Sequence, residues 1–185
     1  MSTPVTPRAR RTRDRIQAVA LDLFERHGYG ATTVEAIAGA AGVTPMTFFR
    51  HYPTKDAVVV TDPFDPLVAA AVGAQPADLP VLDRVRRGLL AALDAVDPDE
   101  DEVARRRVAV VAAEPALRAA VVASTAATEA AIVDRLVADG APRLDATVAT
   151  AACLAACTAA LLAADPGTPL HATVARALDV LAVAP

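Results

Sequence analysis

The chain has 185 residues, 54% of them hydrophobic, which is enough for packed cores in one small and one larger domain. Its net charge of −4 is unevenly divided, because residues 1–60 carry eight Arg or Lys against five acids and residues 61–185 carry ten against seventeen. The three histidines lie too far apart for a metal site, and no apolar run follows the basic amino terminus, so we expect a cytoplasmic protein without metal, cofactor or secretory signal.

The first 27 residues combine a basic segment with an amphipathic helix. Residues 1–10 are expected to form a basic, flexible arm, and a helix is expected over residues 11–27 with an apolar face. The arginines of this region, with only Asp14 among them, have a density suited to displacing counterions from a polyanion. By itself, such a segment is more often a solubilising or disordered tail.

Residues 33–55 have the pattern of two short helices that cross at a steep angle. Thr33 can cap the first helix, and Gly42 follows its last turn, where a left-handed backbone favours glycine. Thr44 and Pro45 begin the second helix as its cap and first residue. This is a helix-turn-helix, whose second helix contacts base edges in the DNA major groove. Joined to the basic segment, it predicts DNA binding.

From residue 61 onward the helical period continues between prolines, and no segment alternates like a β-strand. The predicted fold is all-α, with an N-terminal three-helix helix-turn-helix domain over residues 11–60 and a C-terminal helical bundle over residues 61–185. The later helices are expected over residues 54–62, 67–72, 81–96, 99–114, 115–139, 142–164 and 169–184. Alanine and threonine dominate the most hydrophobic stretch, residues 146–164, and the pattern of interfacial charges typical of a membrane span does not flank it, so we expect no membrane span.

The last two expected helices carry apolar stripes that favour dimerisation. Twofold symmetry would place two recognition helices one DNA turn apart, although the same stripes could instead close the core of a monomer. The stripe residues are Leu154, Leu161, Leu162, Val174, Leu178, Val180 and Leu181.

Residues 13–58 resemble the DNA-binding domain of TetR-family transcriptional repressors. The stretches that carry the resemblance are RDRIQAVALDLFERHGYGATTVEAIAGAAGV and TPMTFFRHYPTKDAV. The resemblance implies that Pro45–His51 is the recognition helix, that the two threonine caps also meet phosphates, and that Lys55 binds phosphate. Met46 and Phe49 depart from the family pattern, in which a small or basic residue and a tyrosine are common.

The expected partner is palindromic double-stranded operator DNA, bound by a homodimer through the last two helices. Phe49 lacks the hydroxyl of the usual tyrosine, so packing or contact with a thymine methyl remains for it. The residues expected to contact DNA are Arg10, Arg11, Thr33, Thr44, Pro45, Met46, Thr47, Phe49, Arg50, His51 and Lys55.

The segment from DPFDPLV to RRRVAVVAAEPALRAAVVAS resembles the C-terminal domains of a TetR subgroup that includes mycofactocin regulators and others thought to bind acyl-CoA-like ligands. No aromatic residue follows Phe64, so an aliphatic ligand suits this domain better than a planar one. Arg106 or Arg118 would contact an anion. Alternatively, the apolar residues are core and the arginines form a solvated ion-pair network. The candidate ligand contacts are Phe64, Leu89, Leu93, Arg106, Val110, Arg118, Val121, Val122, Thr125 and Cys157.

These patterns predict a homodimeric repressor that a small apolar or acyl-CoA-like effector releases from its operator. The alternative is a DNA-binding regulator without such an effector, controlled by a protein partner or by oxidation of Cys153 and Cys157, although buried packing is the simpler interpretation of these thiols. No spacing of nucleophile and base, phosphate-binding glycine loop or carboxylate pair predicts an enzyme.

Overall fold

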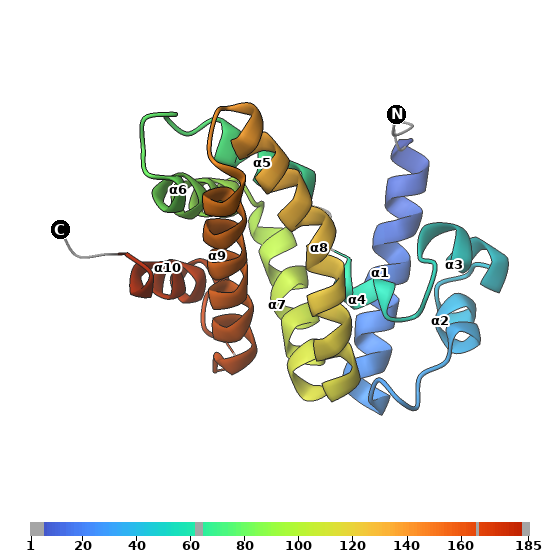
Figure 1. The fold of residues 1–185 in the computed structure, drawn as a ribbon. Helices are drawn as coiled ribbons and strands as arrows, with labels where there is room; N and C mark the ends of the chain where they lie inside the picture. The colour runs from blue at the N-terminus through green and yellow to red at the C-terminus, as the bar shows by residue number, and fades with distance from the viewer. Residues whose placement is uncertain (1–5, 62–64, 166, 183–185) are drawn as a thin grey trace.

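A computed structural model describes residues 6–61, 65–165 and 167–182 of the chain. Within these ranges the chain forms ten α-helices and no β-strand, which confirms the predicted all-α class. The first three helices are α1 (Pro7–His27), α2 (Val34–Ala40) and α3 (Pro45–His51). Figure 1 shows these three helices at one end of the molecule, with the other helices packed beside them as a bundle.

Helix α1 starts earlier than the sequence pattern indicated. Thr6 caps it, because its side-chain oxygen accepts a hydrogen bond from the backbone N–H of Ala9 at 3.3 Å, and Pro7 occupies the first helical position. The prediction of a flexible arm was therefore wrong for residues 7–10, which form the first turn of α1. Residues 1–5 lie outside the described part of the chain.

Helices α2 and α3 form the predicted helix-turn-helix. Thr33 caps α2 by accepting from the N–H of Ala36 at 3.2 Å, and Thr44 caps α3 by accepting from the N–H of Thr47 at 3.2 Å. Gly42, between the helices, has a φ of 64°, a conformation that costs little only for glycine. The cap residues and the turn are thus confirmed by the structure.

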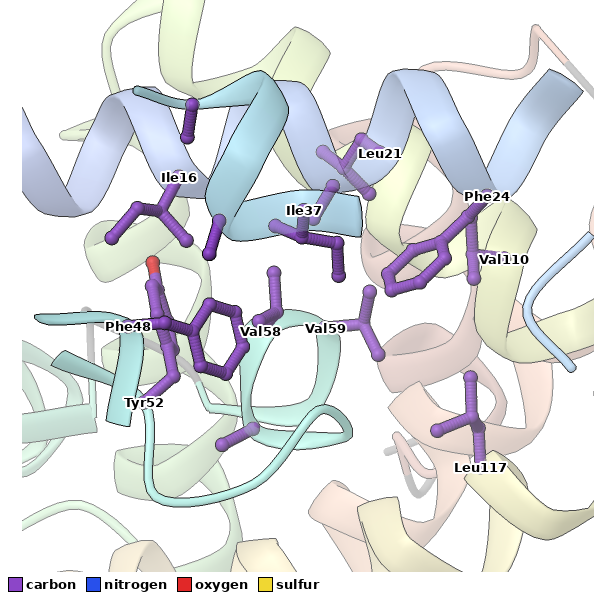
Figure 2. Close-up of a cluster of buried hydrophobic side chains, with 14 of the residues drawn as sticks. Ile16, Leu21, Phe24, Ile37, Phe48, Tyr52, Val58, Val59, Val110 and Leu117 are labelled. Carbon is purple, nitrogen blue, oxygen red and sulfur yellow. The ribbon is translucent and has the colours of Figure 1, made fainter. Parts of the chain in front are cut away.

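One apolar cluster holds the N-terminal helices together and continues into the bundle (Figure 2). Phe48 and Tyr52, in and after α3, are at most 1% exposed and lie beside Ile16 of α1. Val110 and Leu117, from the bundle, belong to the same cluster. The position of α3 is therefore fixed by a core that the helix-turn-helix shares with the larger half of the chain.

Helix α4 (Ala57–Val60) is a single turn, shorter than the helix expected over residues 54–62. Val58 and Val59 are buried in the shared core, and the backbone is extended at Thr61. Three consecutive valines followed by threonine explain the short helix, because β-branched side chains lose rotamer freedom in a helix. Residues 62–64 lie outside the described residues.

The bundle contains the remaining helices, whose bounds are close to those expected. A second apolar cluster lies at its centre and includes Val72, Val85, Ile132, Leu136 and Leu178. The helices are α5 (Asp65–Gly73), α6 (Val81–Asp94), α7 (Pro98–Ala113), α8 (Pro115–Ala138), α9 (Arg143–Ala163) and α10 (Leu170–Val180).

By length and composition alone, α8 and α9 could each cross a membrane. Core helices of soluble proteins have the same properties, and both of these helices contribute to the second apolar cluster through Ile132 and Leu136 of α8 and Cys153 of α9, all fully buried. Their hydrophobicity is accounted for in part by this packing.

The structure places part of the predicted dimerisation stripe away from the surface of the subunit. Val174 and Leu178 of α10 are buried within the bundle, and Leu154, Leu161 and Leu162 of α9 face its interior. Only Val180 of that stripe is strongly exposed, at 80%. A helical stripe does not by itself show which side faces solvent, and here the leucines face inward. The exposed large apolar residues on α9 are Leu144 and Val148.

Candidate nucleic-acid interface and ligand cavity

The candidate DNA-contacting surface is the exposed face of α3. Phe48 and Tyr52 anchor the helix from below, while Met46 is 80% exposed and Phe49 is 50% exposed. Arg50 is also exposed. A helix held through one face and open on the other, with its N-terminal residues accessible, has the geometry that insertion into a major groove requires.

Two threonine side chains organise the start of this helix. The hydroxyl oxygens of Thr44 and Thr47 lie 3.1 Å apart, so one donates a hydrogen bond to the other in addition to the capping bond. Phe49 meets Phe48 edge to face, with ring centroids 5.5 Å apart, so part of its ring packs and the rest faces solvent. Both arrangements leave polar and apolar groups at the surface where bases would lie.

The basic residues around α3 differ in exposure and in the bonds that they make within the protein. Arg11 is exposed, and Arg10 is exposed but pairs with Glu100 of α7 at 3.0 Å. Lys55 is half-buried, and its ammonium donates to two backbone carbonyls, those of Tyr29 at 2.8 Å and Thr32 at 2.9 Å. The sequence pattern did not indicate this internal role of Lys55.

His51 ends α3 in a partly buried position. Desolvation lowers the pKa of its imidazole below the ordinary value of 6.5, and the nearby guanidinium groups of Arg50 and Arg13 lower it further. The ring is therefore neutral at pH 7, not the cation that the helix dipole alone would favour.

The bundle contains a cavity of about 270 Å³ that is partly open to solvent and has a largely apolar wall. Its position was predicted in part, because Leu89, Leu93, Val121, Thr125 and Cys157 all line it. Among the described residues, no aromatic side chain lines the cavity, in agreement with the sequence. A wall of this kind favours an aliphatic ligand.

Three other candidate ligand residues lie away from the cavity. Val110 packs in the core shared with the helix-turn-helix, one position before Val111, which does line the cavity. Arg106 pairs with Asp22 at 2.6 Å and with Glu25 at 2.7 Å, both on α1. These corrections follow from helix geometry, since neighbouring residues point about 100° apart.

Arg118 also lies outside the cavity lining, because it is exposed and donates to the carbonyl of Ala112. The contacts of Arg118 and Arg106 are thus with other parts of the protein surface, in line with the alternative that these arginines serve the structure and do not contact a ligand. Phe64 lies outside the described residues, as does the side chain of Val122.

Apart from Thr125, the sequence pattern did not indicate the polar residues of the cavity wall, nor its contact with α4. Val59 and Val60 of α4 line the wall, as do Arg107 of α7 and the α8 residues Ser124 and Thr128. Helical spacing could have indicated Arg107, because positions 104, 107, 108 and 111 share one face and all line the cavity.

The two cysteines are buried in α9. Burial raises the pKa of the Cys153 thiol to about 11 and that of the Cys157 thiol to about 12. Because the thiolate is the reactive form, both thiols have little tendency to be oxidised at neutral pH. This argues against cysteine oxidation as the control mechanism.

An exposed helix of a helix-turn-helix, joined to a helical bundle, defines the class of helix-turn-helix DNA-binding regulators. The model for bacterial regulatory proteins of the tetR family matches residues 16–60, and the model for the MftR C-terminal domain matches residues 79–184. The second match alone covers more than half of the chain. The chain belongs to the TetR family, whose members are non-enzymatic, DNA-binding, dimer-forming transcriptional regulators.

Two curated relatives match about half of the chain. The HTH-type transcriptional regulator TcmR of Streptomyces glaucescens is 40% identical over 111 residues, covering 50% of this chain and 49% of that protein. The putative mycofactocin biosynthesis transcriptional regulator MftR of Mycobacterium tuberculosis is 34% identical over 107 residues, covering 56% of this chain and 53% of that protein. The chain thus spans about half the length of the curated relatives it matches.

Solved structures show the same fold at low sequence identity. SmeT, the repressor of the Stenotrophomonas maltophilia multidrug efflux pump SmeDEF, has a TM-score of 0.58 and 22% identity over 91% of this chain and 87% of that one. NalD, the secondary repressor of the MexAB-OprM pump of Pseudomonas aeruginosa, has a TM-score of 0.53 and 19% identity over 94% of this chain and 97% of that one. At this identity the likeness concerns the fold alone.

Proposed function

We propose that the protein is a cytoplasmic homodimeric repressor that leaves its operator when a small apolar effector occupies the bundle cavity. In this proposal residues 11–60 bind DNA and residues 61–185 bind the effector and the second subunit. The observation that carries it is the double role of α4, since Val59 belongs both to the core beneath the helix-turn-helix and to the cavity wall. A ligand that displaces this wall therefore acts on the support of α3.

The DNA contacts would come from the exposed face of α3 and from its flanks. Thr47 and Arg50 would contact base edges, whereas Arg10, Arg11, Thr33 and the other flanking residues would contact phosphates. A symmetric pair of subunits would place two copies of α3 about 34 Å apart on an inverted repeat. The exposed apolar residues Leu144 and Val148 of α9 and Val180 of α10 supply the dimer surface.

The effector would be apolar over most of its length, including the acyl chain of an acyl-CoA-like compound. A cavity of about 270 Å³ has room for an aliphatic chain, whereas the large nucleotide part of coenzyme A would have to remain outside it.

The test begins with the isolation of genomic fragments that the purified protein retains against random competitor DNA. Retained fragments are then challenged with acyl-CoA thioesters of graded chain length and with the matching free aliphatic compounds. Release that increases with chain length up to a limit supports the proposal. Retention of an operator that none of these compounds releases would refute an effector of this class.

A further inference from the structure

The backbone carbonyls at the end of α4 are satisfied by side chains from three other helices. Gln17 of α1 donates to the carbonyl of Val58 at 2.9 Å. The hydroxyl of Ser124 of α8 lies 3.2 Å from the carbonyl of Val60 and 2.9 Å from that of Val121, so its one proton is shared between the two carbonyls. Arg107 of α7 donates through Nε to the carbonyl of Val59 at 3.0 Å and through Nη2 to that of Thr61 at 2.8 Å. The last carbonyls of a helix have no partner within the helix, so these bonds hold the end of α4 in place.

Two of these three donors line the cavity. Arg107 is 9% exposed, and both it and Ser124 belong to the cavity wall. Among the described ion pairs, no carboxylate contacts Arg107, because Asp101 in the same wall pairs with Arg105 at 3.2 Å. A nearly buried guanidinium whose described partners are all carbonyls favours a ligand that brings a negative charge.

Thr128 is a further polar residue of the same wall, and unlike Arg107 its hydroxyl has no described partner. It lies one helical turn after Ser124 on α8, lines the cavity and is 5% exposed, and its hydroxyl oxygen has no hydrogen-bond partner among the residues that the structure describes. A buried hydroxyl without a partner costs stability unless a ligand supplies the bond. The wall therefore combines a cation with an unpaired donor in apolar surroundings.

We propose that the cavity binds an aliphatic carboxylate, whose chain contacts the apolar wall and whose carboxylate is bound by Arg107 and Thr128. This inference rests on the proposed function and specifies its ligand. The carboxylate competes with the carbonyls of Val59 and Thr61 for the guanidinium, so its binding releases the end of α4. Through the shared core and the Gln17 bond, α4 then shifts relative to α1 and α3, which changes the spacing of the two recognition helices.

The first measurement is calorimetric titration of the full-length protein, without DNA, with a saturated fatty acid and with the alcohol and methyl ester of equal chain length. We expect the carboxylate to bind at least about tenfold more tightly than either neutral compound, since charged hydrogen bonds in buried sites are strong. Equal affinities would overturn the proposal. Tight binding of the coenzyme A thioester alone would also overturn it.

The second measurement uses variants of the two polar residues. Arg107→Gln can still donate to one carbonyl but has no charge, so the preference for the carboxylate over the alcohol should disappear. Thr128→Val removes only the unpaired hydroxyl, so carboxylate affinity should fall severalfold while alcohol affinity is unchanged. Thr158→Val makes the same change at a cavity residue on α9 and serves as the matched control.

The proposal can be tested even if Arg107→Gln does not fold. The preference of the unaltered protein for the carboxylate over the alcohol, and the change in carboxylate affinity in Thr128→Val, are measured without that variant. If both variants still bind the carboxylate more tightly than the alcohol, as the unaltered protein does, the proposal is overturned. Failure of this inference can be told apart from failure of the proposed function. If the protein binds its operator but no aliphatic compound, the proposed aliphatic effector is rejected. If it binds the acid and the alcohol equally well, only the roles of Arg107 and Thr128 are rejected.

Discussion

Lys55 lies over the ring of Tyr29, with its Nζ 4.0 Å from the ring centroid. The same ammonium donates to the carbonyls of Tyr29 and Thr32, and the hydroxyl of Tyr29 donates to Asp56. Two of the three N–H donors of Lys55 are thereby used inside the protein. Lys55 thus connects the turn after α1 to the start of α4, whatever further contact it makes with phosphate.

Because of these bonds, Lys55→Met should lower the free energy of unfolding by about 1–3 kcal/mol. It should also weaken binding to all DNA sequences. Thermal and denaturant unfolding measure the first effect. Arg11→Met is the control, because Arg11 is exposed and its loss should leave stability unchanged while reducing the salt dependence of DNA binding. An unaltered melting temperature in Lys55→Met would contradict the structural role.

Thr47→Ala should reduce affinity for the operator without altering affinity for random DNA. The hydroxyl of Thr47 lies at the accessible start of α3 beside Thr44, where it can turn toward a base edge. The expected loss for the operator is about 1–3 kcal/mol. Competition binding at one salt concentration measures both affinities. Equal losses for operator and random DNA would show that Thr47 does not contact bases.

Operator binding should strengthen as the pH falls below 7 if His51 contacts a phosphate. In the free protein the pKa of His51 lies below 6.5, and a nearby phosphate would raise it, so the complex takes up a proton. Operator affinity then increases as the pH falls through the interval between two values, the pKa of His51 in the DNA complex and its lower pKa in the free protein. Binding measured across this interval should depend less on pH in His51→Gln. An identical pH profile in the variant would rule out the contact.

The lowered pKa of His51 in the free protein also makes folding stability depend on pH. Because the folded state lowers the pKa of His51, protonation favours the unfolded chain, and the contribution of His51 to stability decreases from pH 6.5 downward. Urea unfolding of the free protein and of His51→Gln over this range should therefore show a smaller loss of stability in the variant.

Gly88→Ala should destabilise the bundle. A Cβ atom at Gly88 of α6 would lie 2.5 Å from the Cα and 2.7 Å from the backbone nitrogen of Val72 on α5, so the two helices would have to separate. We expect a loss of about 1–3 kcal/mol in unfolding free energy. Gly39→Ala is the matched control, since a Cβ there meets nothing within 4 Å and should raise stability by roughly 0.5–1 kcal/mol in a helix. Equal stability of the two variants would contradict this packing.

The sequence predicted the helix-turn-helix well because its signals are local. Thr33, Gly42 and Pro45 each mark a helix end or turn through the conformation of their own backbone or the nearest N–H groups. The length of α4 is harder to predict from the sequence. A prolonged helical pattern indicates a long helix, whereas three consecutive β-branched residues indicate a short one. Its final position depends on bonds from Gln17 and Arg107, which are distant in sequence.

The cavity was only partly predictable because its wall is assembled from several helices. Spacing groups residues on a helix face but does not say which face points inward. The sequence pattern therefore indicates Arg106 as a ligand contact, whereas Arg107 lines the cavity. The same ambiguity placed Leu154 and Leu161 at a dimer surface, although they line the interior. The division at residue 60 and the individual DNA contacts remain predictions.

The most direct test of DNA recognition is selection from a randomised duplex library, in excess competitor DNA, with the unaltered protein and with Arg50→Ala. We expect enrichment of an inverted repeat with half-site centres about one helical turn apart, about 10 base pairs, and loss of that enrichment in the variant. If the unaltered protein enriches no sequence at moderate ionic strength, the assignment of α3 as a recognition helix is contradicted.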